Sequence, residues 1–142
     1  MPTSARQPDL LVDTSAAIAL VVADHAAHRS VAAAVRGRSL GLAGHAAYET
    51  FSVLTRLPAP VRRTPRAAVR LIQENFPRTR LLGVRPAARV LERFAELGIS
   101  GGAVYDALVG ATAVEHGIVL ATRDRRALTT YRALDVVVEV WD

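Results

Sequence analysis

The sequence lacks two residue types entirely, and each absence excludes a group of functions. None of its 142 residues is cysteine, which excludes disulfides, thiolate zinc sites, iron–sulfur clusters and thiol nucleophiles. All 18 basic residues are arginine, so functions that require a lysine are excluded, including Schiff-base chemistry, a P-loop and a phosphorylated receiver domain. Aromatic residues make up only 5% of the chain, but hydrophobic residues make up 51%, which excludes a disordered or collagen-like chain.

Long hydrophobic segments are also missing. The longest unbroken apolar run, residues 16–23, is too short to cross a bilayer, so we expect no membrane association. Residues 1–8 are polar and are expected to form a flexible N-terminal tail rather than a secretion signal. Residues 9–142 have the length of one domain, and the absence of cysteine is compatible with the reducing cytoplasm, where we expect the protein to act.

The charge that is present is strongly biased. The formal net charge is +5, and every positive side chain is an arginine. Because the planar arginine fork pairs with phosphate oxygens, this composition favours a phosphate-rich partner such as a nucleic acid. A coding bias towards arginine is the alternative explanation, although it accounts less well for the positive balance.

Short apolar runs alternate with longer amphipathic stretches along the chain. The apolar runs predict strands at residues 10–12, 40–44, 80–82, 118–121 and 136–140. Capping residues and helical periodicity predict helices at residues 15–22, 25–35, 45–57, 65–75, 86–97, 103–116 and 127–134. This alternation predicts a three-layer αβα domain with a central, mainly parallel five-stranded sheet.

Four carboxylates occupy positions where such a fold binds ligands, the carboxyl ends of its strands. Asp13 follows the first strand and Asp124 follows the fourth, so both are expected at the same edge of the sheet. Asp106 lies in the first turn of its helix among small apolar residues, and Glu49 lies early in another helix. Buried carboxylates need a partner or a cation, and oxygen ligands favour Mg²⁺, or Mn²⁺, over zinc.

Each acid also has a structural explanation of its own. Asp13 is placed to cap a helix, and Asp106 is placed to interact with the dipole of its helix. Asp124 is suited to start a turn, and Glu49 to be an exposed surface residue. The occurrence of all four together, with no lysine to neutralise them, is what favours a metal site.

These motifs, taken in order, resemble the PIN-domain ribonucleases and, more narrowly, the VapC-type toxins of type II toxin–antitoxin systems. The resemblance covers residues 9–140 and rests on Asp13-Thr14-Ser15, Glu49, Tyr105-Asp106-Ala107-Leu108 and Thr122-Arg123-Asp124. One departure is Asp135, where these toxins often have a glycine before the last strand. A second is the pair Arg125-Arg126, at positions that vary in the family.

The resemblance implies a Mg²⁺-dependent endoribonuclease. Four residues match the catalytic, metal-binding acids of the family, with the glutamate binding directly or through water: Asp13, Glu49, Asp106 and Asp124. Three residues match the supporting hydroxyls: Thr14, Ser15 and Thr122. The resemblance further implies an RNA substrate, a homodimer and a cognate antitoxin protein that covers the site.

Three arginines flank the last acid and are expected to contact the RNA backbone: Arg123, Arg125 and Arg126. Positive charge at a helix start opposes the helix dipole, so helix stability alone does not explain them. An inactive α/β module that binds RNA or regulates another protein is the alternative that the sequence leaves open.

Overall fold

A parallel sheet forms the centre of the fold, with strands in the spatial order β2-β1-β3-β4. The computed structural model describes residues 6–142. Its four strands are β1 (Leu10–Val12), β2 (Leu40–Leu42), β3 (Leu120–Thr122) and β4 (Val138–Val140). Every residue of β1, β2 and β3 is buried, as expected for parallel strands that are covered on both faces.

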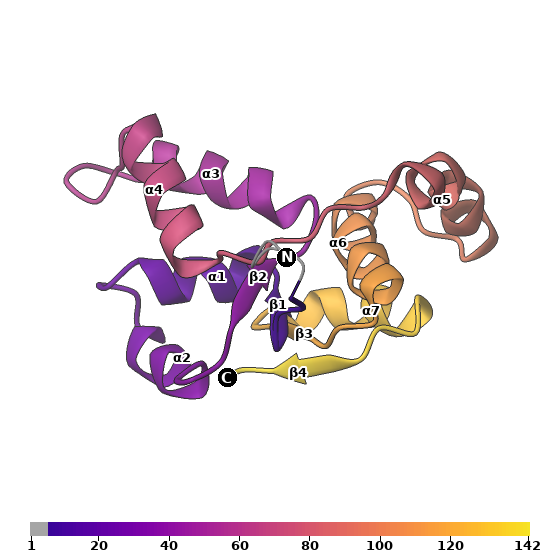
Figure 1. Cartoon of the computed structure of the whole chain (residues 1–142). Helices are drawn as coiled ribbons and strands as arrows, with labels where there is room; N and C mark the ends of the chain where they lie inside the picture. Colours follow the sequence, from indigo (N-terminus) through magenta and orange to yellow (C-terminus); the bar gives the residue numbers. More distant parts are fainter. Residues whose placement is uncertain (1–5) are drawn as a thin grey trace.

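The helices lie on either side of the strands in Figure 1, with α1–α4 to the left and α5–α7 to the right. In the described part of the chain they are α1 (Thr14–Val21), α2 (His28–Ala34), α3 (Ala46–Arg56), α4 (Pro65–Asn75), α5 (Val84–Glu96), α6 (Ala103–His116), the 3₁₀ turn η2 (Arg125–Ala127) and α7 (Leu128–Ala133). This arrangement is consistent with the predicted three layers. None of these helices has the length and apolar character needed to span a membrane.

The prediction of a fifth strand at residues 80–82 is wrong. The segment lies beside β2, where the backbone N–H groups of Arg78 and Arg80 donate to Leu40 and Leu42, but only an isolated bridge between Ala43 and Arg80 forms. The physical reason is a competing side chain. The Leu42 N–H donates to the Thr79 hydroxyl at 3.0 Å, which interrupts the backbone ladder at its centre.

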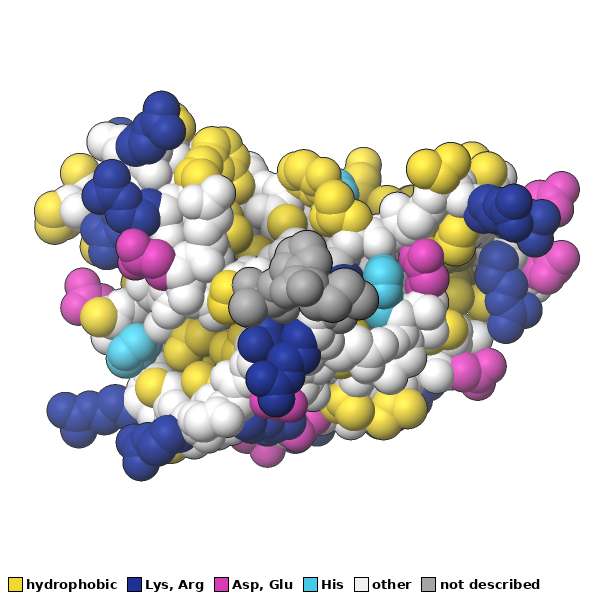
Figure 2. All heavy atoms as spheres, viewed as in Figure 1, with side chains coloured by type: hydrophobic (Ala, Val, Ile, Leu, Met, Phe, Trp, Pro, Cys, Tyr) yellow, Lys and Arg dark blue, Asp and Glu magenta, His cyan; other side chains and the backbone are white. Residues whose placement is uncertain are grey.

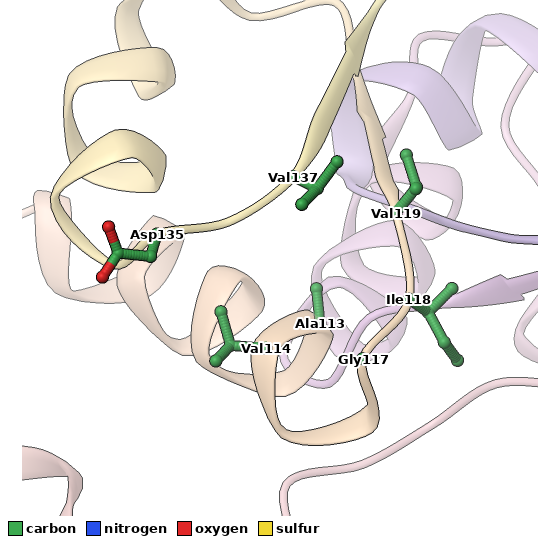
Figure 3. Close-up of a pocket in the computed structure, with 7 residues that line it drawn as sticks. All are labelled: Ala113, Val114, Gly117, Ile118, Val119, Asp135 and Val137. Atoms are coloured by element: carbon green, nitrogen blue, oxygen red, sulfur yellow. The ribbon is translucent and has the colours of Figure 1, made fainter.

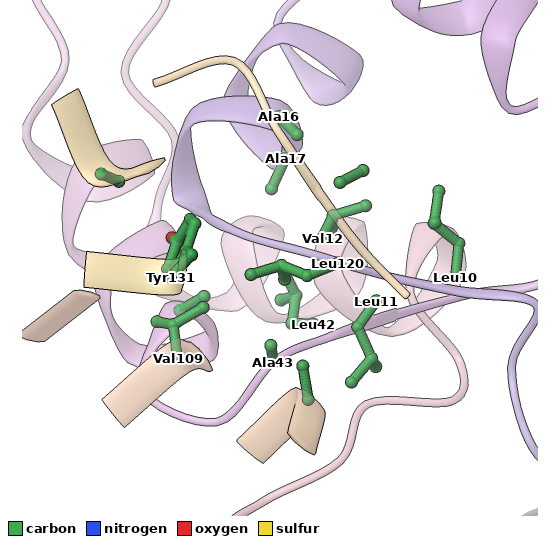
Figure 4. Close-up of a cluster of buried hydrophobic side chains, with 14 of the residues drawn as sticks. Leu10, Leu11, Val12, Ala16, Ala17, Leu42, Ala43, Val109, Leu120 and Tyr131 are labelled. Atoms are coloured by element: carbon green, nitrogen blue, oxygen red, sulfur yellow. The ribbon is translucent and has the colours of Figure 1, made fainter. Parts of the chain in front are cut away.

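The core is built from the strands and from small residues on the helices that cover them. Leu10, Leu11 and Val12 belong to the same buried cluster as Ala16 and Ala17 of α1. In Figure 4, Ala16 and Ala17 lie on the side of β1 opposite to the one toward which Leu11 points, because side chains alternate along a strand. These alanines are fully buried, so α1 approaches the sheet closely. This close approach brings the first turn of α1 to the carboxyl end of β1.

The first described residues pack against the rest of the domain. Of the tail predicted at residues 1–8, residues 1–5 lie outside the described part. Pro8 is buried, and the Gln7 amide donates to the His116 carbonyl at 3.4 Å.

Asp135, in the turn before β4, has a φ of 60°, in the left-handed region that favours glycine. The departure at this position therefore places a residue with a Cβ where a glycine would carry less backbone strain.

Candidate active site

The strand order places the expected site at the centre of the sheet. From β1 the chain continues to β2 on one side, and from β3 it continues to β4 on the other. The order therefore reverses between β1 and β3, where open α/β sheets bind ligands. Asp13 follows β1 directly, and its backbone N–H donates to the Ala121 carbonyl of β3 at 3.1 Å.

The four predicted acids converge there. All of them line one cavity of about 80 Å³, together with Thr14, Ser15, Val109 and Tyr131. Asp13 is the N-cap of α1 and Asp124 is the N-cap of η2. Glu49 and Asp106 lie in the first turns of α3 and α6. Four separate elements thus bring the carboxylates together. Asp13 also caps a helix as predicted, and Asp124, which was expected to start a turn, caps the 3₁₀ turn η2.

Asp13 is the most deeply placed of the acids, with 4% of its surface exposed. Its Oδ1 accepts hydrogen bonds from the Ser15 hydroxyl at 2.6 Å and from the Ala16 N–H at 3.1 Å. Its Oδ2 accepts one from the Tyr131 hydroxyl at 2.9 Å. Burial raises the pKa of Asp13, and these hydrogen bonds oppose the rise because they stabilise the carboxylate.

The convergence of the acids makes the ionised form of Asp106 less favourable. Burial raises its pKa to about 6, and the negative charges of Asp124, Asp13 and Glu49 add to the rise. Arg126 opposes the rise. Across residues 6–142, no hydrogen bond contributes to the pKa of Asp106, so the charge of Arg126 offsets the rise only in part.

The three predicted hydroxyls connect the acids to the strand ends. Thr14 Oγ1 donates to Glu49 Oε2 at 3.0 Å. Ser15 Oγ accepts the Arg123 N–H at 2.9 Å, and Thr122 Oγ1 accepts the Asp124 N–H at 3.0 Å. The hydroxyls therefore orient the acids and hold the loop after β3 against α1.

The three flanking arginines differ in their surroundings. Arg126 is almost fully exposed, and its Nε lies 3.6 Å from Asp124 Oδ1. Arg125 pairs with the Asp142 carboxylate, and the Nε of Arg123 is buried without a hydrogen-bond partner in residues 6–142. On the face shown in Figure 2, other arginine side chains are spread over several helices rather than gathered in one patch. Contact of the three arginines with RNA stays a prediction.

Two residues of the site were missed from the sequence. Tyr131 is fully buried and donates to Asp13, but its spacing from Leu128 and Leu134 gives it the pattern of an ordinary core aromatic. His45 Nε2 lies 3.3 Å from Glu49 Oε1. The signal for His45 was its position four residues before Glu49, which places both on one helix face.

The side-chain oxygens of the acidic cavity are ligands that suit a hard cation, although they are not spaced as in a formed metal site. Among residues 6–142, no three His, Asp or Glu side chains are positioned to hold a metal ion. The cavity nevertheless presents only carboxylate and hydroxyl oxygens as polar side-chain groups, the ligands that Mg²⁺ prefers. Asp13 Oδ2 accepts a hydrogen bond from Tyr131, and a carboxylate oxygen has a second lone pair that can face a cation. These residues fit a divalent cation, which stays a prediction.

A different cavity lies at the other end of β3. It has a volume of about 190 Å³ and is lined mainly by apolar groups, including Val114, Ile118, Val119 and Val137, as Figure 3 shows. Asp135 is its one ionisable lining residue. This cavity has no set of groups that converge on a reacting atom, so the acidic cavity remains the candidate active site.

Comparison with known sequences finds a family and relatives that match nearly the whole chain. The PIN domain family matches residues 10–133. Ribonuclease VapC27 of Mycobacterium tuberculosis is 48% identical over 134 residues, which are 94% of this chain and 98% of the relative. Ribonuclease VapC40 of the same species is 41% identical over 130 residues, which are 90% of this chain and 96% of the relative.

Solved structures show the same fold at low sequence identity. FitAcB from Neisseria gonorrhoeae matches with a TM-score of 0.69 at 20% identity, over 91% of this chain and 95% of that chain. VapBC2 from Rickettsia felis, solved with a DNA fragment from its promoter, matches with a TM-score of 0.65 at 10% identity, over 94% of this chain and 98% of that chain. With the family match over residues 10–133, these comparisons show that the chain belongs to the PIN-domain family.

Proposed function

We propose that this chain is a Mg²⁺-dependent endoribonuclease and the toxin of a type II toxin–antitoxin pair. The observation that carries the proposal is the convergence of four carboxylates from four elements in one cavity at the strand-order reversal. The ribonuclease names of relatives at 48% and 41% identity support the RNA substrate. Mn²⁺ is the second cation that we expect the site to accept.

The proposed roles follow from the burial and contacts of each acid. Bound Mg²⁺ would supply a water of lowered pKa and would neutralise charge at the phosphoryl oxygens. Asp13, which is held by three hydrogen bonds, would be the central ligand. Asp106 and Asp124 would complete the ligand set. Glu49, oriented by the Thr14 hydroxyl, would bind directly or through water.

Substrate binding would combine general and local positive charge. The net charge of +5 attracts a polyanion, and Arg126 extends into solvent beside Asp124. Arg126 is therefore our first candidate for a contact with an RNA phosphate. Arg123 and Arg125 would add to this contact from the same loop.

Two kinds of protein partner belong to the proposal. We propose a homodimer and an antitoxin that covers the acidic cavity. The similarity to the FitAcB and VapBC2 structures supports the antitoxin, and the homodimer rests on the resemblance to VapC-type toxins alone. Co-expression with the product of a short adjacent reading frame should restore growth and should block RNA cleavage by the purified chain. An adjacent product that neither binds the chain nor restores growth would contradict the proposed pairing.

The central experiment compares the unchanged chain with two charge-removing variants, Asp13→Asn and Asp124→Asn. We expect induced expression of the unchanged chain to arrest growth, and the purified chain to cleave single-stranded RNA with Mg²⁺ but not with EDTA. Both variants should lose cleavage and keep most of their RNA affinity. The second variant guards against misfolding of Asp13→Asn, whose amide would face three hydrogen-bond donors.

The matched control is Glu74→Gln, which removes the charge of an exposed acid on α4, outside the cavity lining. It should cleave as the unchanged chain does. If all four proteins bind RNA and none cleaves it with Mg²⁺ or Mn²⁺, the nuclease proposal fails. That result would favour the inactive RNA-binding module.

A further inference from the structure

Exposed aromatic side chains are rare in this protein and gather in one place. The chain has seven Phe, Tyr and Trp residues, and among residues 6–142 only Tyr48 and Tyr105 are highly exposed, at 62% and 52%. The His45 ring lies between them. Its centroid is 5.2 Å from that of Tyr105 in a stacked arrangement, and 6.4 Å from that of Tyr48. We call His45, Tyr48 and Tyr105 the aromatic shelf.

The shelf adjoins the acidic cavity. His45 Nε2 lies 3.3 Å from Glu49 Oε1, and Tyr105 directly precedes Asp106 in the first turn of α6. A nucleic acid strand with a phosphate at the acids would have these rings within reach of a neighbouring nucleotide.

A hollow of about 230 Å³ accompanies the shelf. Its lining is Gly44, His45, Tyr48, Leu81, Leu82, Leu108 and Thr112, with no carboxylate and no arginine. Its surface is therefore suited to a planar, uncharged ring rather than to a phosphate. In the described chain neither exposed tyrosine hydroxyl has a hydrogen-bond partner, so both are available to a ligand.

We infer that the aromatic shelf binds one nucleobase of the RNA substrate next to the scissile phosphate. This inference rests on the proposed ribonuclease function and adds a binding subsite to it. Aromatic side chains stack with any base, so the shelf supplies affinity and register rather than a base-specific code. A second copy of the chain would need a contact of about 800 Å² on each partner, which a small concave hollow does not by itself indicate.

The test removes the rings and keeps the fold. The double variant Tyr48→Ala with Tyr105→Ala is compared with Tyr48→Phe with Tyr105→Phe, each in an Asp124→Asn background that blocks cleavage. Anisotropy with a labelled single-stranded RNA measures Kd. We expect the alanine pair to weaken binding about 5- to 150-fold, and the phenylalanine pair to stay close to the parent because stacking is kept.

Two further readouts separate stacking from other effects. The slope of log Kd against log salt should not change in the alanine pair, since no phosphate contact is lost. Removing the base from one nucleotide of the RNA at a time should weaken binding by the parent at one position and have little effect there in the alanine pair. Leu91→Ala, at a 70% exposed position on α5, is the control for loss of an exposed apolar side chain and should change nothing.

The outcomes distinguish this inference from the proposed function. If the chain with both tyrosines and all four acids cleaves no RNA, the proposed function fails and the inference falls with it. If that chain cleaves RNA but the alanine pair binds RNA as tightly as the parent, the inference alone is overturned. Unchanged RNA affinity together with loss of a dimer in sedimentation would assign the shelf to a second copy instead.

Discussion

The carboxylate of Asp106 should destabilise the fold when no cation is present. Its pKa is raised to about 6 by burial and by three neighbouring acids, and no ion pair compensates it in residues 6–142. We therefore expect Asp106→Asn to increase the free energy of unfolding at pH 7 in EDTA. The asparagine has nearly the same shape and removes the charge that the other acids repel.

The size of the effect follows from the pKa. A rise from 3.8 to about 6 corresponds to about 3 kcal/mol at 1.36 kcal/mol per pKa unit. Asp106 is only half-buried, and solvent screens part of this repulsion. We therefore expect a gain of about 1–2 kcal/mol at pH 7, measured from urea unfolding followed by the fluorescence of Trp141.

The pH dependence gives the sign of the effect. Above pH 6 Asp106 is ionised in both the folded and the unfolded chain, so its carboxylate lowers the free energy of unfolding by the full amount. As the pH falls from about 6 towards 3.8, the folded chain takes up the proton first, and the contribution of Asp106 to stability rises. Below pH 3.8 both states are protonated, and the advantage of the asparagine should disappear.

The control is Asp24→Asn, which removes the charge of an exposed aspartate outside the acidic cavity. It should leave the free energy of unfolding within about 0.5 kcal/mol of the unchanged chain. Two results would refute the argument from burial and charge repulsion. One is an Asp106→Asn variant that is less stable than the unchanged chain at pH 7, and the other is a gain in stability that is the same at pH 7 and pH 3.5.

Three further predictions concern single contacts, each measured by urea unfolding. Tyr131→Phe removes the hydroxyl that donates to Asp13 Oδ2 and should lower the free energy of unfolding by about 1.5–3 kcal/mol. Tyr105→Phe, on an exposed ring, should leave it unchanged, and equal effects of the two variants would contradict the assigned hydrogen bond. Asp135→Gly should be about 1 kcal/mol more stable than Asp135→Ala because φ is positive there, and the reverse order would exclude strain. Gly41→Ala should lose about 1–3 kcal/mol because its Cβ would overlap the Arg78 carbonyl, while Gly102→Ala, with open space around it, should lose nothing; a tolerated Gly41→Ala would show that residues 78–80 move easily.

Local sequence predicted most of the elements. The run Leu10-Leu11-Val12 followed by Asp13 identified both β1 and the capped start of α1. Thr64 and Pro65 marked the start of α4 in the same way. These predictions succeed because burial and capping depend on residue types within a few positions of one another.

Elements that depend on competing partners were less predictable. Leu81 and Leu82 gave residues 80–82 the apolar pattern of a short strand, but the Thr79 hydroxyl accepts the Leu42 N–H that a strand partner would need. Whether a side chain or a backbone carbonyl makes that bond is decided by how two distant segments meet. The apolar pattern of either segment carries no information on that choice.

Residue type and position in the predicted elements were enough to predict that the four acids lie together, because each follows a predicted strand or lies in the first turn of a predicted helix, and all four line one cavity. Only the packed chain decided that Tyr131 donates to Asp13 across 118 positions and that burial, together with three neighbouring acids, raises the pKa of Asp106. Hydrogen bonds and charge repulsion act over a few ångströms in space. Separations of that size between segments far apart in the chain are set by the packing of helices on the sheet.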